Sequence, residues 1–508
     1  MPTKRPEDPE IITAFFPEDD QDHQGIFRSQ FGSRWSIDDT QYDDLVNWVP
    51  CGRNLVQVPA NGPTIASLPS PAIWISAQPL NAATYLFCLC NNGHIYQVSL
   101  GGSVITDVSG ATAMSALSDI ANWQGTRILF SDVNVSKIYS WDGATFATVF
   151  TGQPASFITV FSSRLWMANG STVTFTAGGT FNSLAGDSGS FVITDTDCPP
   201  PIRVISPFSG NLFIGGYQWY QVVAGLFDSG SPAVLQFQKN TLTDEAGIYT
   251  KWSFLPYGYS LYYASLYGIW SLLGSQPQFV SEPIGSFFQN LTIANSSLSA
   301  AYGQVLGEPS LFWQFYDAAS ATYRVWGMTY NRQQWFSVSQ GNIFFITYGT
   351  DQTNGQQKIW AVDTAGNLFQ LFAGNGAVTS TYQSKLWSLG ARIREKSILR
   401  AGVELVVASA ATISLTALDE NLNAQTPLLQ SVNPSTAFNW TNNYVPFNWT
   451  NAGNPFNWTV KMTQYWLMDF DLEMTVKKIG VNVSVTSAGA TVLAQGLEFE
   501  ELPADWGM

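Results

Sequence analysis

The chain has 508 residues, of which 14% are aromatic and only 12% are charged. A coiled coil or a disordered chain carries far more charge or far fewer aromatic residues, so this composition excludes both classes. The 37 acidic and 22 basic residues give a formal net charge of −15. A protein that grips nucleic acid neutralises phosphates with Lys and Arg, so this balance argues against phosphate binding as the main role. We expect an all-β protein with large buried or mated faces.

Residues 1–48 are predicted to form an extended N-terminal arm. Prolines at positions 2, 6, 9 and 17 disfavour helix, and acidic residues cluster at 18–22 and 38–44. A solvated tail is one interpretation of these features. The aromatic residues in the arm are unusually many for a free tail, so we expect the arm to lie against its own chain or a neighbour's. These residues are Phe15, Phe16, Phe27, Phe31 and Trp35.

Residues 49–380 are predicted to form a β-propeller. Alternating apolar and polar residues predict short strands, and Asn-Gly and Asp-Gly pairs between them indicate hairpin turns. The predicted strands are 85–90, 94–99, 126–131, 137–141, 145–150, 164–168, 172–176, 211–215, 218–223, 260–265, 268–272, 322–330, 333–339, 342–349, 358–363 and 367–371.

An aliphatic residue followed by an aromatic one recurs along this region, at Ile95-Tyr96, Ile138-Tyr139, Leu165-Trp166, Leu212-Phe213, Ile269-Trp270 and Leu368-Phe369. The spacing is irregular, from 27 to 99 residues, and the longest gap has room for at least one more unit, near 311–339. Units of about 40–50 residues with about four strands are typical of a propeller, and we expect six to eight blades. Two or three β-sandwiches in a row are the competing architecture.

Residues 381–508 are predicted to form a separate antiparallel β-sandwich, with strands at 403–407, 412–418, 475–485 and 490–499. A basic cluster opens this region and consists of Lys385, Arg392, Arg394, Lys396 and Arg400. The cluster is either a solvated strand face or a surface that meets an acidic partner.

The insertion at 436–460 contains the sequence Phe-Asn-Trp-Thr three times, with a strict period of nine residues. In an extended segment the Phe and Trp side chains share one face. We expect this aromatic row to contact a neighbouring chain or to join the sandwich core. Its members are Phe438, Trp440, Phe447, Trp449, Phe456 and Trp458.

Metal and membrane chemistry are not expected. The four cysteines at 51, 88, 90 and 198 form no Cys-x-x-Cys pair, and only two histidines are present, so we predict no zinc site and no cofactor. Cys88 and Cys90 would share one face of a strand as small core residues. The apolar runs are too short to span a bilayer and the N-terminal residues do not form a secretory signal, so we expect neither a membrane anchor nor secretion.

The sequence indicates no catalytic residues. Gly186-Asp187-Ser188-Gly189 is similar to a serine-protease turn, but it lacks a plausible partner other than His94. Complete sialidase loops, a phosphate-binding loop and a zinc-protease motif are absent from the sequence. A glycosidase with two carboxylates stays open, because Asp and Glu are abundant. We predict that the protein is not an enzyme.

The layout resembles the tail tube protein of short-tailed bacteriophages, also called the tail hub, nozzle or tail accessory factor. The resemblance rests on the order of the segments and on several short local sequences. These are Leu45–Pro50 with Pro59–Pro63, Ile158–Trp166, Ile202–Phe213, Gly247–Ile284, and Leu415–Leu418 running into Asp419-Glu420. The nine-residue triplicate does not match the pattern of that family.

The resemblance implies a structural virion protein, assembled in the host cytoplasm and placed in the tail. Six copies would form a ring below the portal and its adaptor ring, fibres or spikes would attach outside, and genome DNA would pass through without specific binding. The basic cluster and the aromatic row would serve ring assembly or adaptor docking. The alternatives are a receptor- or carbohydrate-binding tail protein, with the aromatic row as the sugar platform, and a propeller glycoside hydrolase.

Overall fold

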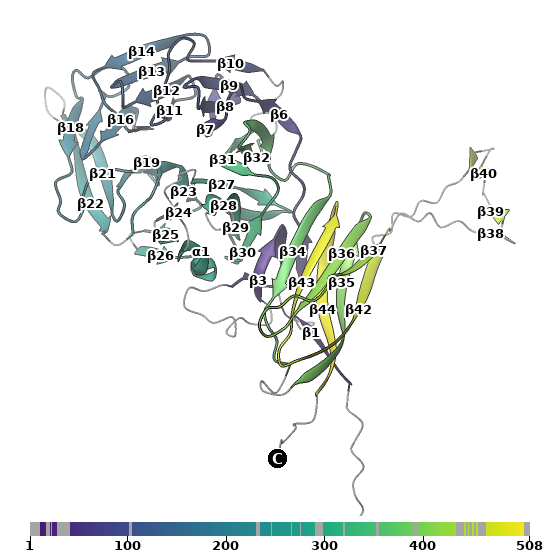
Figure 1. The fold of residues 1–508 in the computed structure, drawn as a ribbon. Helices are drawn as coiled ribbons and strands as arrows, with labels where there is room; N and C mark the ends of the chain where they lie inside the picture. The colour runs from purple at the N-terminus through teal and green to yellow at the C-terminus, as the bar shows by residue number, and fades with distance from the viewer. Residues whose placement is uncertain are drawn as a thin grey trace, which may run out of the picture. The chain divides into compact units, whose positions relative to one another are not determined.

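The computed structural model describes residues 11–16, 21, 23–27, 41–100, 104–229, 234–244, 246–265, 267–274, 276–289, 298–317, 321–351, 355–389, 395–432, 441–442, 445–446, 450–451, 454–455 and 464–501. Strands dominate these residues (Figure 1), and the helices are limited to η2 (Lys251–Ser253), η3 (Glu282–Ile284) and α1 (Gly285–Gln289). None of the described helices has the length and apolar character needed to cross a membrane. The chain divides into two compact units, residues 62–333 with 341–371, and residues 1–61 with 334–340 and 372–508.

The first unit is a ring of seven sheets, six with four strands each and one with three strands inside this unit. In chain order the sheets consist of β7 (Ala72–Leu80), β8 (Ala83–Cys90), β9 (Ile95–Ser99) and β10 (Ile105–Asp107); β11 (Asp119–Trp123), β12 (Arg127–Asp132), β13 (Lys137–Trp141) and β14 (Phe146–Thr151); β15 (Phe157–Phe161), β16 (Arg164–Asn169), β17 (Thr172–Phe175) and β18 (Gly189–Val192); β19 (Val204–Phe208), β20 (Asn211–Gly215), β21 (Tyr220–Ser229) and β22 (Val234–Thr243); β23 (Leu255–Tyr257), β24 (Ser260–Ala264), β25 (Ile269–Leu273) and β26 (Gln276–Phe279); β27 (Ser299–Val305), β28 (Glu308–Asp317) and β29 (Thr322–Thr329); and β31 (Ile343–Thr350), β32 (Gln357–Asp363), β33 (Asn367–Gln370) and β6 (Thr64–Ser67).

The ring closes on itself. First strands of neighbouring sheets contact one another, β7 with β11, β11 with β15, β15 with β19, β23 with β27, β27 with β31, and β31 with β7. The fourth and fifth sheets share one hydrophobic cluster. The last sheet takes its outer strand from the start of the unit, with Ala66 opposite Leu368. Radial closure protects the strand edges of a β-propeller. The predicted propeller is therefore confirmed, and a row of sandwiches is excluded for this unit.

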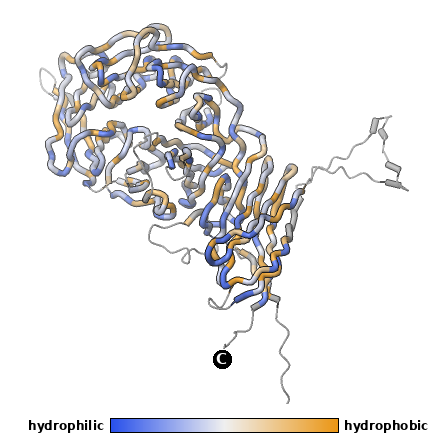
Figure 2. The backbone as a smooth tube through the Cα atoms, in the orientation of Figure 1, coloured by the Kyte–Doolittle hydropathy of each residue, from blue (hydrophilic) through white to orange (hydrophobic). Residues whose placement is uncertain are grey.

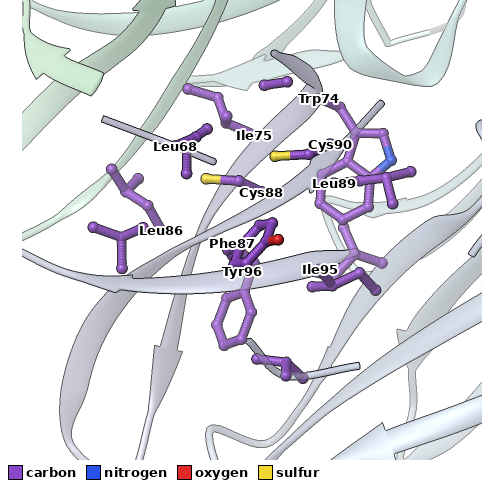
Figure 3. Packing of buried hydrophobic residues seen from close by; sticks show 14 of the residues in the cluster. Leu68, Trp74, Ile75, Leu86, Phe87, Cys88, Leu89, Cys90, Ile95 and Tyr96 are labelled. Carbon is purple, nitrogen blue, oxygen red and sulfur yellow. The ribbon is translucent and has the colours of Figure 1, made fainter. Parts of the chain in front are cut away.

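The first sheet is buried on both sides, because the consecutive residues Leu86–Cys90 of β8 all lie in the core (Figure 3). Trp74, Phe87 and Ile95 are buried together with Cys88 and Cys90 of β8. None of the four cysteines is in a disulfide bond. Burial raises the pKa of the Cys88 thiol and raises that of Cys90 to about 12, so both stay protonated and unreactive at neutral pH.

The second unit is the predicted β-sandwich, with two sheets. Sheet A contains β4 (Trp48–Cys51), β5 (Asn54–Gln57), β44 (Ala490–Glu501), β35 (Lys396–Val407) and β42 (Gln464–Val476), and β1 (Ile11–Phe16) adds to β44. In this unit sheet B contains β30 (Trp335–Val338), β3 (Gln41–Val46), β34 (Val378–Ser384), β43 (Gly480–Ser487), β36 (Ala411–Leu418) and β37 (Leu428–Val432), and β2 (Gly25–Ile26) adds to β3. Figure 2 shows apolar and polar residues alternating along these strands. The single strand predicted at 475–485 is wrong, because a bend at 477–478 separates β42 from β43.

The sequence-based segments and the structural units differ in their limits. The chain passes from the sandwich unit to the propeller after Asn61 and returns after Leu371, and residues 334–340 between these points belong to the sandwich unit. Within the predicted arm, β1, β2 and β3 are strands of the sandwich sheets. Two short strand pairs, β38 (Thr441–Asn442) with β39 (Val445–Pro446) and β40 (Thr450–Asn451) with β41 (Asn454–Pro455), lie in the predicted insertion.

Two buried amides hold the sandwich together. Asn47 has a left-handed backbone with φ of 60°, and its side chain donates to the carbonyls of Ser339 and Thr379 at 3.0 and 2.8 Å while accepting from the amide of Ser339 at 2.8 Å. Gln57 of sheet A donates to the carbonyl of Val378 in sheet B at 2.7 Å and accepts from Ser487 at 2.7 Å. Buried amides with every partner in place specify one packing of the two sheets.

Replacing Asn47 by Ala is expected to destabilise the sandwich unit by about 3 kcal/mol, because three hydrogen bonds are lost and a left-handed backbone disfavours Ala. Asn47→Gly is the control, because it keeps the backbone geometry and removes only the hydrogen bonds. Urea unfolding followed by hydrogen exchange in β34 measures both losses. Equal stability of the wild type and the Ala variant would contradict this role.

Candidate functional site

The outward face of sheet A gathers acidic side chains on three neighbouring strands. On β35 the residues that point inward, including Ala401 and Val403, are fully buried, whereas Arg400 and Glu404 on the alternate positions are accessible. The strand register places Glu498 of β44 and Asp471 of β42 on either side of Arg400. One row across the sheet therefore consists of Glu498 on β44, Arg400 on β35 and Asp471 on β42.

We define the acidic face as Glu404, Asp471, Glu498 and Glu500. Glu500 lies opposite Ser397, two rows away from the pair of Arg400 and Glu498. Arg400 donates from Nε to Asp471 Oδ1 at 3.0 Å, but the two side chains are 55% and 77% exposed, so this pair adds little stability. Four carboxylates and one guanidinium on the same face of the sheet leave a negative surface, which repels phosphate groups.

The structure separates two residues of the predicted basic cluster. Lys396 is fully buried, and its Nζ donates to the carbonyl of Lys477 at 3.4 Å. A register irregularity between Ile398 and Arg400 reverses which side of the sheet the following residues face. Lys396 thus points into the sandwich and Arg400 points out of it, so only Arg400 of this pair is accessible to a partner.

The other residues predicted to bind partners lie outside the described residues. These are Arg392 and Arg394, and the aromatic row of Phe438, Trp440, Phe447, Trp449, Phe456 and Trp458. Their role in assembly or docking stays a prediction.

The propeller contains a polar contact across the ring that sequence reasoning missed. Lys251 of η2, just before the fifth sheet, places Nζ 2.5 Å from Asp119 Oδ1 in the second sheet. The same ammonium donates to the carbonyls of Ile120 and Ile158 at 3.0 and 3.3 Å, and Asp119 accepts from the amide of Ile158 at 2.7 Å. One lysine therefore ties three sheets of the ring together.

Trp252, the next residue, extends this contact to two further sheets. Its ring stacks on Trp74 of the first sheet with centroids 5.4 Å apart, and it meets Phe345 of the last sheet edge-on at 5.5 Å. We call Lys251 and Trp252 the ring tie. The sequence signal was weak, since a Lys-Trp pair in a loop has no periodic pattern.

The protease-like turn forms a structural ion pair. Asp187 accepts from the guanidinium of Arg164, which is only 3% exposed, and from the amide of Gly178 at 3.1 Å. His94 instead contacts Asp107 at 2.8 Å in the first sheet, whereas Asp187 precedes β18 of the third. Among the described residues, no group of three or more His, Cys, Asp or Glu side chains is arranged to hold a metal ion.

No protein-family model and no curated protein matches the chain. Solved structures similar to it include virginiamycin B lyase from Staphylococcus aureus, with 11% identity, coverage of 62% of this chain and 98% of that one, and a TM-score of 0.39. A streptogramin B lyase is 11% identical over 60% of this chain and 95% of its own, with a TM-score of 0.37. The β-propeller domain of Cps50 (Swd1) from Myceliophteria thermophila is 10% identical over 62% and 98%, with a TM-score of 0.39.

One expectation from the sequence is corrected here. We predicted that the protein is not an enzyme, but two of the similar structures are lyases by name, so that exclusion is withdrawn. At 10–11% identity and TM-scores of 0.37 to 0.39 the likeness assigns no activity to this chain. What the fold and the accessible residues define is a propeller joined to a sandwich that presents an acidic face.

Proposed function

We propose that the protein is a structural component of the tail of a short-tailed bacteriophage, one copy of a ring that conducts and retains genome DNA below the portal and its adaptor. The acidic face of sheet A is the observation that carries this proposal. A wall with the same sign of charge as DNA repels the phosphates, so a duplex slides past it instead of binding.

The proposal also draws on the overall composition. A charged fraction of 12% is about half of that in an average soluble domain, and it suits a protein whose surface is largely covered by neighbouring subunits. The long strands of the sandwich supply a rigid platform on which such a ring is built. Genome ejection through the ring requires only shape and charge from this chain.

The oligomeric state is the first test. We expect light scattering of the purified chain, alone or with a portal–adaptor complex, to give the mass of a ring of about six 55.7-kDa copies. A density map of particles that contain the protein is expected to place this ring in the tail. A chain that stays monomeric and ignores the portal–adaptor complex would contradict the proposal.

The acidic face is tested by reversing its charge. The ring of the double variant Glu498→Lys, Glu500→Lys is expected to retain short duplex DNA at low salt and to release it as salt rises, because the new ammonium groups displace counterions from the phosphates. Glu282→Lys with Glu308→Lys, on the propeller, is the matched control and is expected to retain less DNA. The measurement is fluorescence anisotropy of labelled duplex across a salt series. Equal DNA retention by both variants would show that the acidic face does not line the passage.

A further inference from the structure

The first described strand, β1, completes sheet A along one edge. Residues 11–16 pair antiparallel with β44, from Ile11 opposite Glu500 to Phe16 opposite Gln495. At the end of the strand the Phe16 ring stacks on Trp387, with centroids 4.5 Å apart and planes inclined by 19°. This edge of β44 therefore recognises residues 11–16 through a main-chain ladder and one aromatic contact.

The attachment of β1 to its own chain is shallow. Among the described strands it pairs with β44 alone, whereas β44 is also held by β35 and β5. Ile12, on the inward side of β1 opposite the buried Phe499, remains 39% exposed. Ordering six backbone residues costs about as much as the ladder hydrogen bonds gain, so such a strand docks and leaves easily.

When β1 leaves, the edge of β44 that it covered is open to pairing with another strand. Without β1, residues 495–500 of β44 present unpaired backbone groups next to β5, and an exposed edge of this kind pairs with another chain. The strand that fits it best is the one with the same sequence from a second copy, because exchange of identical elements forms no new type of contact.

The length of chain behind β1 permits an exchange. Six residues, 17–22, connect β1 to His23, which is buried and whose backbone is bonded to Gly52 and Gln334, and a chain of this length spans at most about 22 Å when extended. Such a reach suits a directly adjacent subunit. If each copy donates its strand to the next copy in one direction, the contact is head-to-tail, and where the rotation between copies closes it forms a ring with every edge filled.

We infer that residues 11–16 of each copy dock on β44 and Trp387 of the neighbouring copy in the assembled protein. This arm exchange rests on the proposed ring, and it assigns the interface that links successive subunits. The contacts of β1 within one chain are then the same contacts that hold two chains together.

The test places one cysteine on each side of the ladder. Thr13 lies opposite Glu498 in the register of β1 and β44. Two full-length chains are therefore co-expressed, one with Thr13→Cys and the other with Glu498→Cys, and both carry Cys51→Ser. A disulfide or a short bis-maleimide bridge between them forms only between two chains. We expect a covalent dimer on a non-reducing gel, and a covalent ladder up to the full ring when one chain carries both cysteines.

The control and the mass measurement separate the possible failures. Thr13→Cys combined with Glu420→Cys, which is not a register partner, is expected to give no ladder. A ring by light scattering whose cysteine pair links only within single chains would overturn the exchange and leave the proposed function standing. A monomer by light scattering would overturn both.

Discussion

Replacing Lys251 by Met is expected to destabilise the propeller by about 3–5 kcal/mol, because removing one partner of a buried ion pair leaves the other charge uncompensated. The side chain of Asp119 is 4% exposed and that of Lys251 is 17% exposed, so water does not replace the lost ammonium. The carbonyls of Ile120 and Ile158 lose a donor in the same variant. The ring tie joins segments 132 residues apart, so its loss acts on ring closure and not on a single hairpin.

Thermal unfolding monitored by near-ultraviolet circular dichroism measures this loss, and hydrogen exchange in β11 and β15 localises it. Lys358→Met is the matched control, because Lys358 pairs with Asp351 at 2.6 Å only seven residues away, and we expect a smaller loss. In the double variant Lys251→Met, Asp119→Asn the buried charge is gone, so part of the stability is expected to return. A Lys251→Met variant as stable as the Lys358→Met variant would contradict the role of the ring tie.

Local sequence patterns predict most of the strands of the fold. Alternating residues around Asn169-Gly170 predicted strands at 164–168 and 172–176, and the structure has β16 and β17 at 164–169 and 172–175. Such hairpins are fixed by neighbouring residues, so a sequence contains nearly all the information they need. The predicted extra unit near 311–339 corresponds to the sheet of β27, β28 and β29.

The irregular repeat has a structural explanation. The aliphatic–aromatic pair lies on the second strand of its sheet in β16 and β20, but on the third strand in β9, β13, β25 and β33. The distance between successive pairs is therefore shorter where the pair moves from a third strand to a second strand, and longer where it moves back. The order of strands within each sheet stays the same. A buried pair of this kind marks a central strand and does not count blades.

Long-range pairing was the part that the sequence did not reveal. Nothing near Ala66 indicates that this strand closes the sheet of Leu368, about 300 residues later, or that Val46 pairs with Ser337. The inward turn of Lys396 depends on an irregularity that moves Arg400 to the other face of β35. A shift of one residue reverses the face of every following side chain, so strict alternation fails beyond it.

Replacing Asp187 by Asn is expected to destabilise the propeller by about 2–3 kcal/mol, because the 3%-exposed Arg164 loses its carboxylate partner. Arg164 keeps its hydrogen bonds to the carbonyls of Thr176 and residue 187 at 2.9 and 3.1 Å, and the Asn oxygen still accepts from the amide of Gly178. The loss of stability in this variant therefore measures the missing negative charge alone. Asp142→Asn is the matched control. Asp142 pairs with Arg127 at 3.4 Å on the surface, so a much smaller loss is expected there.

The pH dependence of this loss distinguishes the ion pair from a packing defect. The hydrogen bond from Arg164 holds the pKa of Asp187 below its ordinary value of 3.8, and the amide of Gly178 adds to the effect against the opposing influence of burial. A carboxyl group with a lowered folded-state pKa contributes stability above its unfolded value, and this contribution disappears as the pH falls through the folded value. The difference in unfolding midpoint between wild type and Asp187→Asn is therefore expected to be constant from pH 7 to about 5 and to shrink below about pH 4. Urea titrations at each pH measure it, and a difference that persists unchanged at pH 3 would assign the loss to packing instead of charge.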